Sequence, residues 1–237
     1  MGGTYARSNQ LVPLNHSSLK VIALDFDGTL IESNHIKNEA FKIVLSKWPD
    51  HQEVMMRWHL AHSSIDRREK FRYFVEEVLG LSGNNDLIEK ITEKFSKLTL
   101  KAIIECPLVE GAMEFLGYFH GKTPLYLVSA TPQKELNEIT AARGMHKYFL
   151  QAFGAPINKT EVLKKIMISE KVSSDEMIYI GDSPEDWQAA IKVGIHFAAR
   201  RSDHTFHNLT DFVFEDMKSI LYHLKNVNIN NAALSNV

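Results

Sequence analysis

Residues 19–30 read LKVIALDFDGTL, an apolar run that ends in two carboxylates and a glycine turn. Alternate side chains share a face in a strand, so we expect Asp25 and Asp27 to point one way and Phe26 the other. Two carboxylates on one face repel each other unless a cation lies between them. A hard ion such as Mg²⁺ would relieve that repulsion and leave one carboxylate as a nucleophile. The alternative is an ordinary acidic turn after a strand, which Asp and Gly commonly form.

The composition is that of a globular protein that binds a small molecule. The chain has 237 residues, of which 44% are hydrophobic and 24% charged, enough for one domain with a sizeable insertion. A net charge of -2 gives no general attraction to nucleic acid or to an anionic membrane. The single cysteine, Cys106, excludes an internal disulfide and fits a reducing cytoplasm. We expect residues 1–18 to be a flexible arm and residues 226–237, which are rich in Asn, a flexible tail.

Apolar runs alternate with helical patterns along most of the chain. Lys20–Asp27, Leu125–Ser129 and Met177–Asp182 are short β-rich runs that end in polar residues, as buried parallel strands do. Strands alternating with helices predict an α/β fold with a doubly wound parallel sheet. Weaker strand candidates are Phe149–Phe153, Ile195–Ala199 and Phe212–Phe214.

The stretch between the first strand and about Pro107 breaks this alternation. Its apolar residues recur at helical spacing, as in Phe41, Val44, Leu45 and Trp48. We therefore expect an inserted helical subdomain at residues 32–105, between core segments 19–31 and 106–225.

Several strand ends supply polar groups that should meet in one crevice. Ligands of an open α/β sheet bind outside the carboxyl ends of its strands, where Asp25, Asp27, Ser129 and Asp182 would converge. Ser129 precedes an expected helix start at Pro132, a place suited to an anion, although Ser129 or Thr131 could simply cap that helix.

The segment Gly181-Asp182-Ser183-Pro184-Glu185-Asp186 closes the third strong strand and opens another helix. Asp182 could complete a Mg²⁺ shell begun by Asp25. Asp186 has two interpretations: it could bind the metal through water or hold a neighbouring ligand, or it could form a capping box with Ser183.

These motifs, in this order and spacing, resemble the haloacid dehalogenase superfamily, in its phosphatase branch with a helical cap, over about Leu19 to Leu224. The resemblance implies a Rossmann-like core, a nucleophile at Asp25 and a general acid/base at Asp27. Lys159 would bind phosphate, whereas the residue alone would be taken for a solvated surface lysine. The resemblance assigns Ser129, Ala130 and Lys159 to the phosphate, and Asp25, Asp27 (through its backbone carbonyl), Asp182 and Asp186 to Mg²⁺. Many relatives have an amide side chain at the position of Ala130. Because the alanine side chain has no polar atom, only the backbone N–H is available there.

The resemblance implies Mg²⁺-dependent hydrolysis of a small phosphomonoester through an aspartyl-phosphate, with phosphoglycolate as a family-level guess at the substrate. One alternative is a phosphosugar mutase of the same superfamily. Another is a binding or regulatory module that has lost turnover.

Charged residues of the expected cap have two interpretations. Arg57, Arg67, Arg68 and Arg72, with His59 among them, could face the core and bind a second anionic group of the substrate, or could be solvated helix charges. His59 and His62 lie three apart, but without a carboxylate in register a packing role is favoured over a metal pair.

Overall fold

A computed structural model describes residues 19–62, 65–202, 206, 210 and 212–234. In it a six-stranded, all-parallel sheet has the order β3-β2-β1-β4-β5-β6. The expected arm at residues 1–18 lies outside the described residues. The strands are β1 (Val21–Leu24), β2 (Leu125–Pro132), β3 (Gln151–Ala155), β4 (Met177–Gly181), β5 (His196–Arg200) and β6 (Val213–Phe214).

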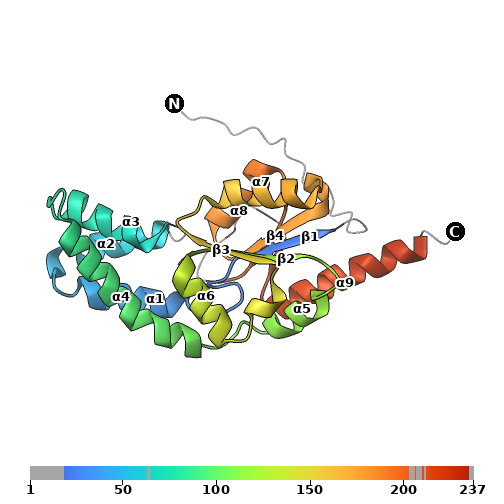
Figure 1. Cartoon of the computed structure of the whole chain (residues 1–237), viewed down its shortest axis with the longest axis horizontal. Helices are drawn as coiled ribbons and strands as arrows, with labels where there is room; N and C mark the ends of the chain where they lie inside the picture. Colours follow the sequence, from blue (N-terminus) through green and yellow to red (C-terminus); the bar gives the residue numbers. More distant parts are fainter. Residues whose placement is uncertain (1–18, 63–64, 203–205, 207–209, 211, 235–237) are drawn as a thin grey trace.

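Helices cover both faces of the sheet, as expected of a doubly wound fold. Figure 1 shows α7 and α8 on one side and α5, α6 and α9 on the other. Their bounds are α5 (Ala112–Phe119), α6 (Gln133–Ala142), α7 (Lys159–Glu170), α8 (Pro184–Val193) and α9 (Met217–Leu234), with short 3₁₀ turns at His146–Tyr148 and Ser174–Glu176.

The central strands are buried on both faces, and alternate residues enter two separate hydrophobic clusters. In β1, Ile22 and Leu24 join the cluster under α5 and α9, whereas Val21 and Ala23 join the cluster under α7 and α8. The alternation repeats in β2 and β4. A strand buried on both faces must be apolar throughout, which is why these strands read as continuous apolar runs.

A helical block at residues 34–105 extends from the carboxyl edge of the sheet. It consists of α1 (Asn34–Leu45), α2 (Pro49–Ala61), α3 (Arg67–Tyr73), a π-helical turn η2 (Phe74–Val78) and α4 (Asn85–Glu105). These helices gather to one side of the sheet in Figure 1. The block has its own hydrophobic cluster, in which Phe41 stacks on Phe71 with ring centroids 4.8 Å apart. The described residues 34–62 and 65–105 include no strand.

The structure corrects the bounds of several elements. β1 ends at Leu24 and not at Asp27, because the chain turns away from the sheet after Asp25. β2 continues to Pro132 and not to Ser129, with an irregular register after Val128. Residues 226–234, expected in a flexible tail, continue α9 to Leu234. Extending an existing helix costs much less than nucleating one, so an Asn-rich sequence can continue it.

No helix among the described residues combines the length and hydropathy that crossing a membrane would require.

Candidate active site

Three buried carboxylates meet at the carboxyl edge of the sheet. Asp25 follows β1, Asp182 follows β4, and Asp186 lies in the first turn of α8. One ligand atom from each lies within 4.8 Å of those of the other two. Neighbouring parallel strands end at the same edge, so residues more than 150 positions apart in the chain converge there, as the sequence predicts.

A glycine turn lets the chain pass this close to Asp182. Gly28 has a φ of +73°, and a Cβ at this position would lie 2.0 Å from Asp182 Oδ2. The same oxygen accepts a hydrogen bond of 2.8 Å from Asn34 Nδ2 of α1. Gly28 is therefore required both by its backbone conformation and by the lack of space.

Asp25 lies against a buried lysine. Lys159 Nζ, at the start of α7, lies 2.8 Å from Asp25 Oδ1, and its side chain is 11% exposed. The alternative of a solvated surface lysine is therefore wrong. Burial raises the pKa of Asp25 well above its usual range; Lys159 opposes this effect, while Asp186, Asp182 and Asp27 add to it. Burial lowers the pKa of Lys159, but Asp186 and Asp25 outweigh it and raise that pKa.

Both interpretations of Asp186 describe part of its surroundings. Its Oδ2 accepts hydrogen bonds from Ser183 N and Ser183 Oγ, completing a capping box on α8. Its Oδ1 lies 2.6 Å from Lys159 Nζ and accepts a 2.7 Å hydrogen bond from Tyr179 OH. Sequence reasoning missed Tyr179, whose only signal is a hydroxyl in an otherwise apolar strand.

The carboxylate of Asp27 lies outside the group of three and is held by a different set of residues. Oδ1 accepts from Ser33 Oγ at 2.6 Å, and Oδ2 accepts from Thr131 Oγ1 at 2.8 Å. Lys37 of α1 forms an ion pair with Oδ2. Burial raises the pKa of Asp27, but Lys37 and these hydroxyl groups outweigh it and hold the pKa below its usual value. The expected repulsion between Asp25 and Asp27 is therefore offset by two lysines, one beside each carboxylate.

The last residues of β2 include two buried hydroxyl groups, those of Ser129 and Thr131, and neither caps α6. The N-cap residue of α6 is Pro132, without a side-chain cap. Ser129 Oγ accepts from Thr131 N at 3.0 Å and lies 3.4 Å from Asp27 Oδ2. Ser129 lies beside Asp27, as the convergence argument predicts, with Ala130 next to it in the chain. Thr131, for which the sequence suggests only a capping role, instead donates a hydrogen bond to Asp27.

Polar contacts join the helical block to the sheet. Lys37 Nζ also donates to Thr131 Oγ1 at 3.2 Å. Arg67 of α3 is 7% exposed and forms a bidentate ion pair with Glu135 of α6. Just before the helical block, Glu32 pairs with Arg200 at the end of β5. Arg200 also donates a hydrogen bond of 3.0 Å to the Gly28 carbonyl.

The charged residues expected in the block divide between the two interpretations. Arg67 faces the core, whereas Arg57, Arg68 and Arg72 form ion pairs with acids of the block itself. His59 is buried and stacked on Phe41, with centroids 3.8 Å apart. His62 stacks on Trp58 at 4.2 Å, so both histidines have packing roles.

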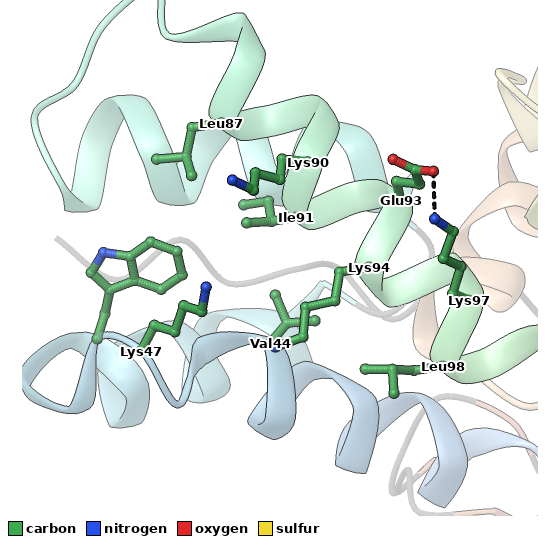
Figure 2. Close-up of a pocket in the computed structure, with 10 residues that line it drawn as sticks. Val44, Lys47, Leu87, Lys90, Ile91, Glu93, Lys94, Lys97 and Leu98 are labelled. Carbon is green, nitrogen blue, oxygen red and sulfur yellow. Dashed lines mark ion pairs between the residues drawn. The ribbon is translucent and has the colours of Figure 1, made fainter.

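A separate groove of about 470 Å³ lies between α1 and α4, away from these carboxylates. Figure 2 shows Val44, Ile91 and Leu98 beside lysines 47, 90 and 94, with Glu93 paired to Lys97. None of the lining residues belongs to the carboxylate site.

The three carboxylates of Asp25, Asp182 and Asp186 together suit a hard divalent cation. The three side chains supply only oxygen ligands, and they are buried close enough together that like charges raise the pKa of Asp25. A divalent cation would supply the positive charge that Lys159 supplies only in part.

The model for the family of haloacid dehalogenase-like hydrolases matches residues 22–200. A 2-hydroxy-3-keto-5-methylthiopentenyl-1-phosphate phosphatase from Microcystis aeruginosa is 28% identical over 199 residues, which are 77% of this chain and 85% of that protein. A predicted phosphoglycolate phosphatase from Haemophilus somnus 129PT has a TM-score of 0.68 at 17% identity, covering 87% of this chain and 98% of that one. A β-phosphoglucomutase from Clostridium difficile has a TM-score of 0.69 at 14% identity, covering 91% and 99%. The family model covers most of the chain, from β1 to β5, and includes Asp25, Asp182 and Asp186. The chain therefore belongs to the haloacid dehalogenase-like hydrolase family.

Proposed function

We propose that this protein is a Mg²⁺-dependent phosphatase that hydrolyses a small phosphomonoester through an aspartyl-phosphate. The observation that carries the proposal is that two neighbouring carboxylates, buried Asp25 and partly buried Asp27, have different surroundings. Asp25 lies with the metal-binding group and Lys159, whereas Asp27 lies among hydroxyl groups and Lys37. The family and the phosphatase from Microcystis aeruginosa support the reaction class.

In the first step Asp25 would attack phosphorus, and Asp27 would protonate the departing alkoxide. Lys159 and the hydroxyl of Ser129, with the backbone N–H of Ala130, would bind the phosphate oxygens and neutralise their charge. The phosphate charge beside Asp27 would favour the protonated form of that carboxyl, as this step requires.

In the second step Asp27 would deprotonate the water that hydrolyses the aspartyl-phosphate. The contacts with Lys37, Ser33 and Thr131 favour the ionised form of Asp27, which is the form that removes a proton. The helical block would act as a cap that closes over this edge and excludes bulk water.

We propose that Mg²⁺ is held by Asp25 and Asp182, with the backbone carbonyl of Asp27 as a further ligand and Asp186 acting through water. The family generally uses a divalent metal, which neutralises phosphate charge and orients the reacting groups. Asp186 would keep Lys159 in place through Oδ1 while Oδ2 stays in the capping box.

A phosphosugar mutase is the second candidate, because β-phosphoglucomutases are among the structural neighbours. A mutase would pass the phosphoryl group from Asp25 to a sugar hydroxyl. The test is a panel of phosphorylated metabolites with Mg²⁺, in which phosphate release and sugar-phosphate isomerisation are measured side by side. Phosphate release alone supports the phosphatase, and isomerisation supports the mutase. If neither reaction is observed, the remaining candidate is the non-catalytic module.

The single Cys106 is consistent with our proposal of a cytoplasmic location.

A further inference from the structure

Two lysines of the helical block lie on the side that faces the candidate active site. Lys37 of α1 contacts both Asp27 and Thr131. Lys70 of α3 is 3% exposed, and its Nζ lies 3.0 Å from His59 Nδ1. The sequence pattern singled out the arginines of this region and neither of these lysines.

A buried histidine fixes the position of Lys70. His59 is stacked on Phe41, and its Nε2 lies 3.0 Å from Asn38 Oδ1. A carbonyl oxygen only accepts, so Nε2 must carry the hydrogen and Nδ1 must accept from the Lys70 ammonium group. Burial, followed by the charges of Lys70 and Lys37, lowers the pKa of His59 to about 2. His59 is therefore neutral at physiological pH, and the hydrogen between the two residues is carried by Lys70.

The position of α3 brings Lys70 towards the sheet, because Arg67, one helical turn before Lys70, pairs with Glu135 of α6. Burial and the charge of Lys37 lower the pKa of Lys70 to about 7, whereas Glu185 and Asp66 raise it. Glu185 lies on α8 next to Asp186, and Lys37 contacts Asp27. The charges of Lys37 on the helical block and of Glu185 on α8 therefore both act on the pKa of Lys70.

We propose that Lys37 and Lys70 receive a carboxylate on the alcohol part of the substrate, so that the enzyme prefers phosphomonoesters with this second anionic group over neutral ones. This inference rests on the proposed phosphatase function.

The chemistry of the two lysines favours a carboxylate over a neutral sugar. An ammonium group donates hydrogen bonds and accepts none, whereas sugar hydroxyls are bound best by donors and acceptors together. A carboxylate can accept hydrogen bonds from both lysines. Lys37 is beside Asp27, where the leaving-group oxygen must lie if Asp27 protonates it. The carboxylate would therefore lie within a few bonds of the ester oxygen.

The test compares two substrates that differ in the group at issue. 3-Phosphoglycerate and glycerol 3-phosphate have the same three-carbon skeleton, with a carboxylate in the first and a hydroxymethyl group in the second. We expect wild-type kcat/KM to favour 3-phosphoglycerate by about 10- to 100-fold, the range for a hydrogen bond to a charged group. In Lys70→Met the ratio of the two kcat/KM values should fall towards one.

Two controls separate this inference from folding and from the proposed function. Lys90→Met removes a lysine from the outer groove of the block and should keep the wild-type ratio. Thermal melting of Lys70→Met reports folding, and the wild-type ratio by itself tests the proposal if that variant does not fold. Hydrolysis of p-nitrophenyl phosphate with equal kcat/KM for the two glycerol derivatives would overturn the carboxylate site and leave the phosphatase. A wild-type ratio unchanged in folded Lys70→Met would also overturn it. No phosphate release from any ester would overturn the phosphatase itself.

Discussion

The sheet and the helical block are stabilised in the same way inside but differ in what they bring to the crevice between them. Each has its own hydrophobic cluster. The sheet supplies the carboxylates Asp25, Asp182 and Asp186, whereas the block supplies Lys37, Lys70 and Arg67. The contacts between the two regions include ion pairs. Ion pairs hold two regions together less tightly than a shared apolar core does. This difference supports our proposals that the sheet supplies the reacting groups and that the helical block recognises the substrate.

Replacing the proposed nucleophile, Asp25, gives the largest expected effect on activity. Asp25→Asn keeps the shape of the side chain and removes the attacking charge, so kcat should fall by at least about 10³-fold. Phosphate release from a purified sample measures this loss. Asp50→Asn, on the exposed start of α2, is the matched control and should retain activity. Near-normal turnover by Asp25→Asn would place the chemistry elsewhere.

Removing divalent metal should silence the enzyme because Asp25, Asp182 and Asp186 would repel both one another and the phosphate. EDTA should abolish phosphate release and added Mg²⁺ should restore it. Ca²⁺ should inhibit, since its larger and more variable coordination shell suits an octahedral site poorly. Full activity in metal-free buffer would contradict the assignment of Asp182 as a ligand.

Replacing Asp27 separates its role from that of Asp25. Asp27→Asn should slow phosphoenzyme formation from alkyl phosphates about 10²- to 10⁴-fold more than from p-nitrophenyl phosphate, whose leaving group needs little protonation. Single-turnover formation of the phosphoenzyme is the measurement, because the second step also uses Asp27. Equal losses for the two ester types would make Asp27 a structural residue and direct the search for the acid to the helical block.

Loosening the contact between the two regions should have a smaller effect. Glu135→Gln removes the carboxylate that pairs with Arg67 without altering the helical block itself. Weaker closure should raise KM about 5-fold, as for the loss of about 1 kcal/mol, with less change in kcat. Steady-state kinetics measure the split, and Glu138→Gln on the exposed face of the same helix is the control. An unchanged KM would mean that this ion pair does not hold the block in place.

The last expected effect concerns the acid stability of the block and not the activity. Unfolded His59 binds a proton below about pH 6.5, whereas in the folded protein its pKa is about 2. The unfolded state therefore binds more protons between these values, and stability falls as the pH is lowered through this window. His59→Gln should reduce the dependence of unfolding free energy on pH by up to about 1.4 kcal/mol per pH unit. Urea unfolding at pH 7, 6 and 5 measures the slope, with exposed His120→Gln as the control; identical slopes for His59→Gln and wild type would contradict a neutral, buried His59.

Much of the sheet could be predicted because its signals are local. A strand buried on both faces must be apolar, and the residues that end it must be polar, so Asp25 and Asp182 are visible in a single sequence. The helical block was equally visible from its 3.6-residue spacing. Strand ends were less accurate, since the point at which the chain leaves the sheet depends on neighbouring strands.

Lys37 and Tyr179 were missed because nothing in their own segments marks them, whereas Thr131 was visible only as a possible cap of the following helix. Lys37 sits in an amphipathic helix where a lysine normally faces water, and only the position of α1 at the carboxyl edge of the sheet brings it to Asp27. Ser33 stands at the N-cap of α1 but gives its hydroxyl to Asp27 instead of capping the helix. Local preference is weak enough that a buried carboxylate overrides it.

The sequence by itself determined where the strands lie, which oxygen-bearing side chains end them, and that these converge on one edge, since strand burial and parallel topology follow from local patterns. Only the tertiary structure decided which cation pairs with which carboxylate. Lys159 lies beside Asp25 and Lys37 beside Asp27, across separations of 134 and 10 residues. Such pairings depend on where α1 and α7 lie relative to the sheet. The strength of an electrostatic interaction depends on the distance between the charges in space and not on their separation along the chain.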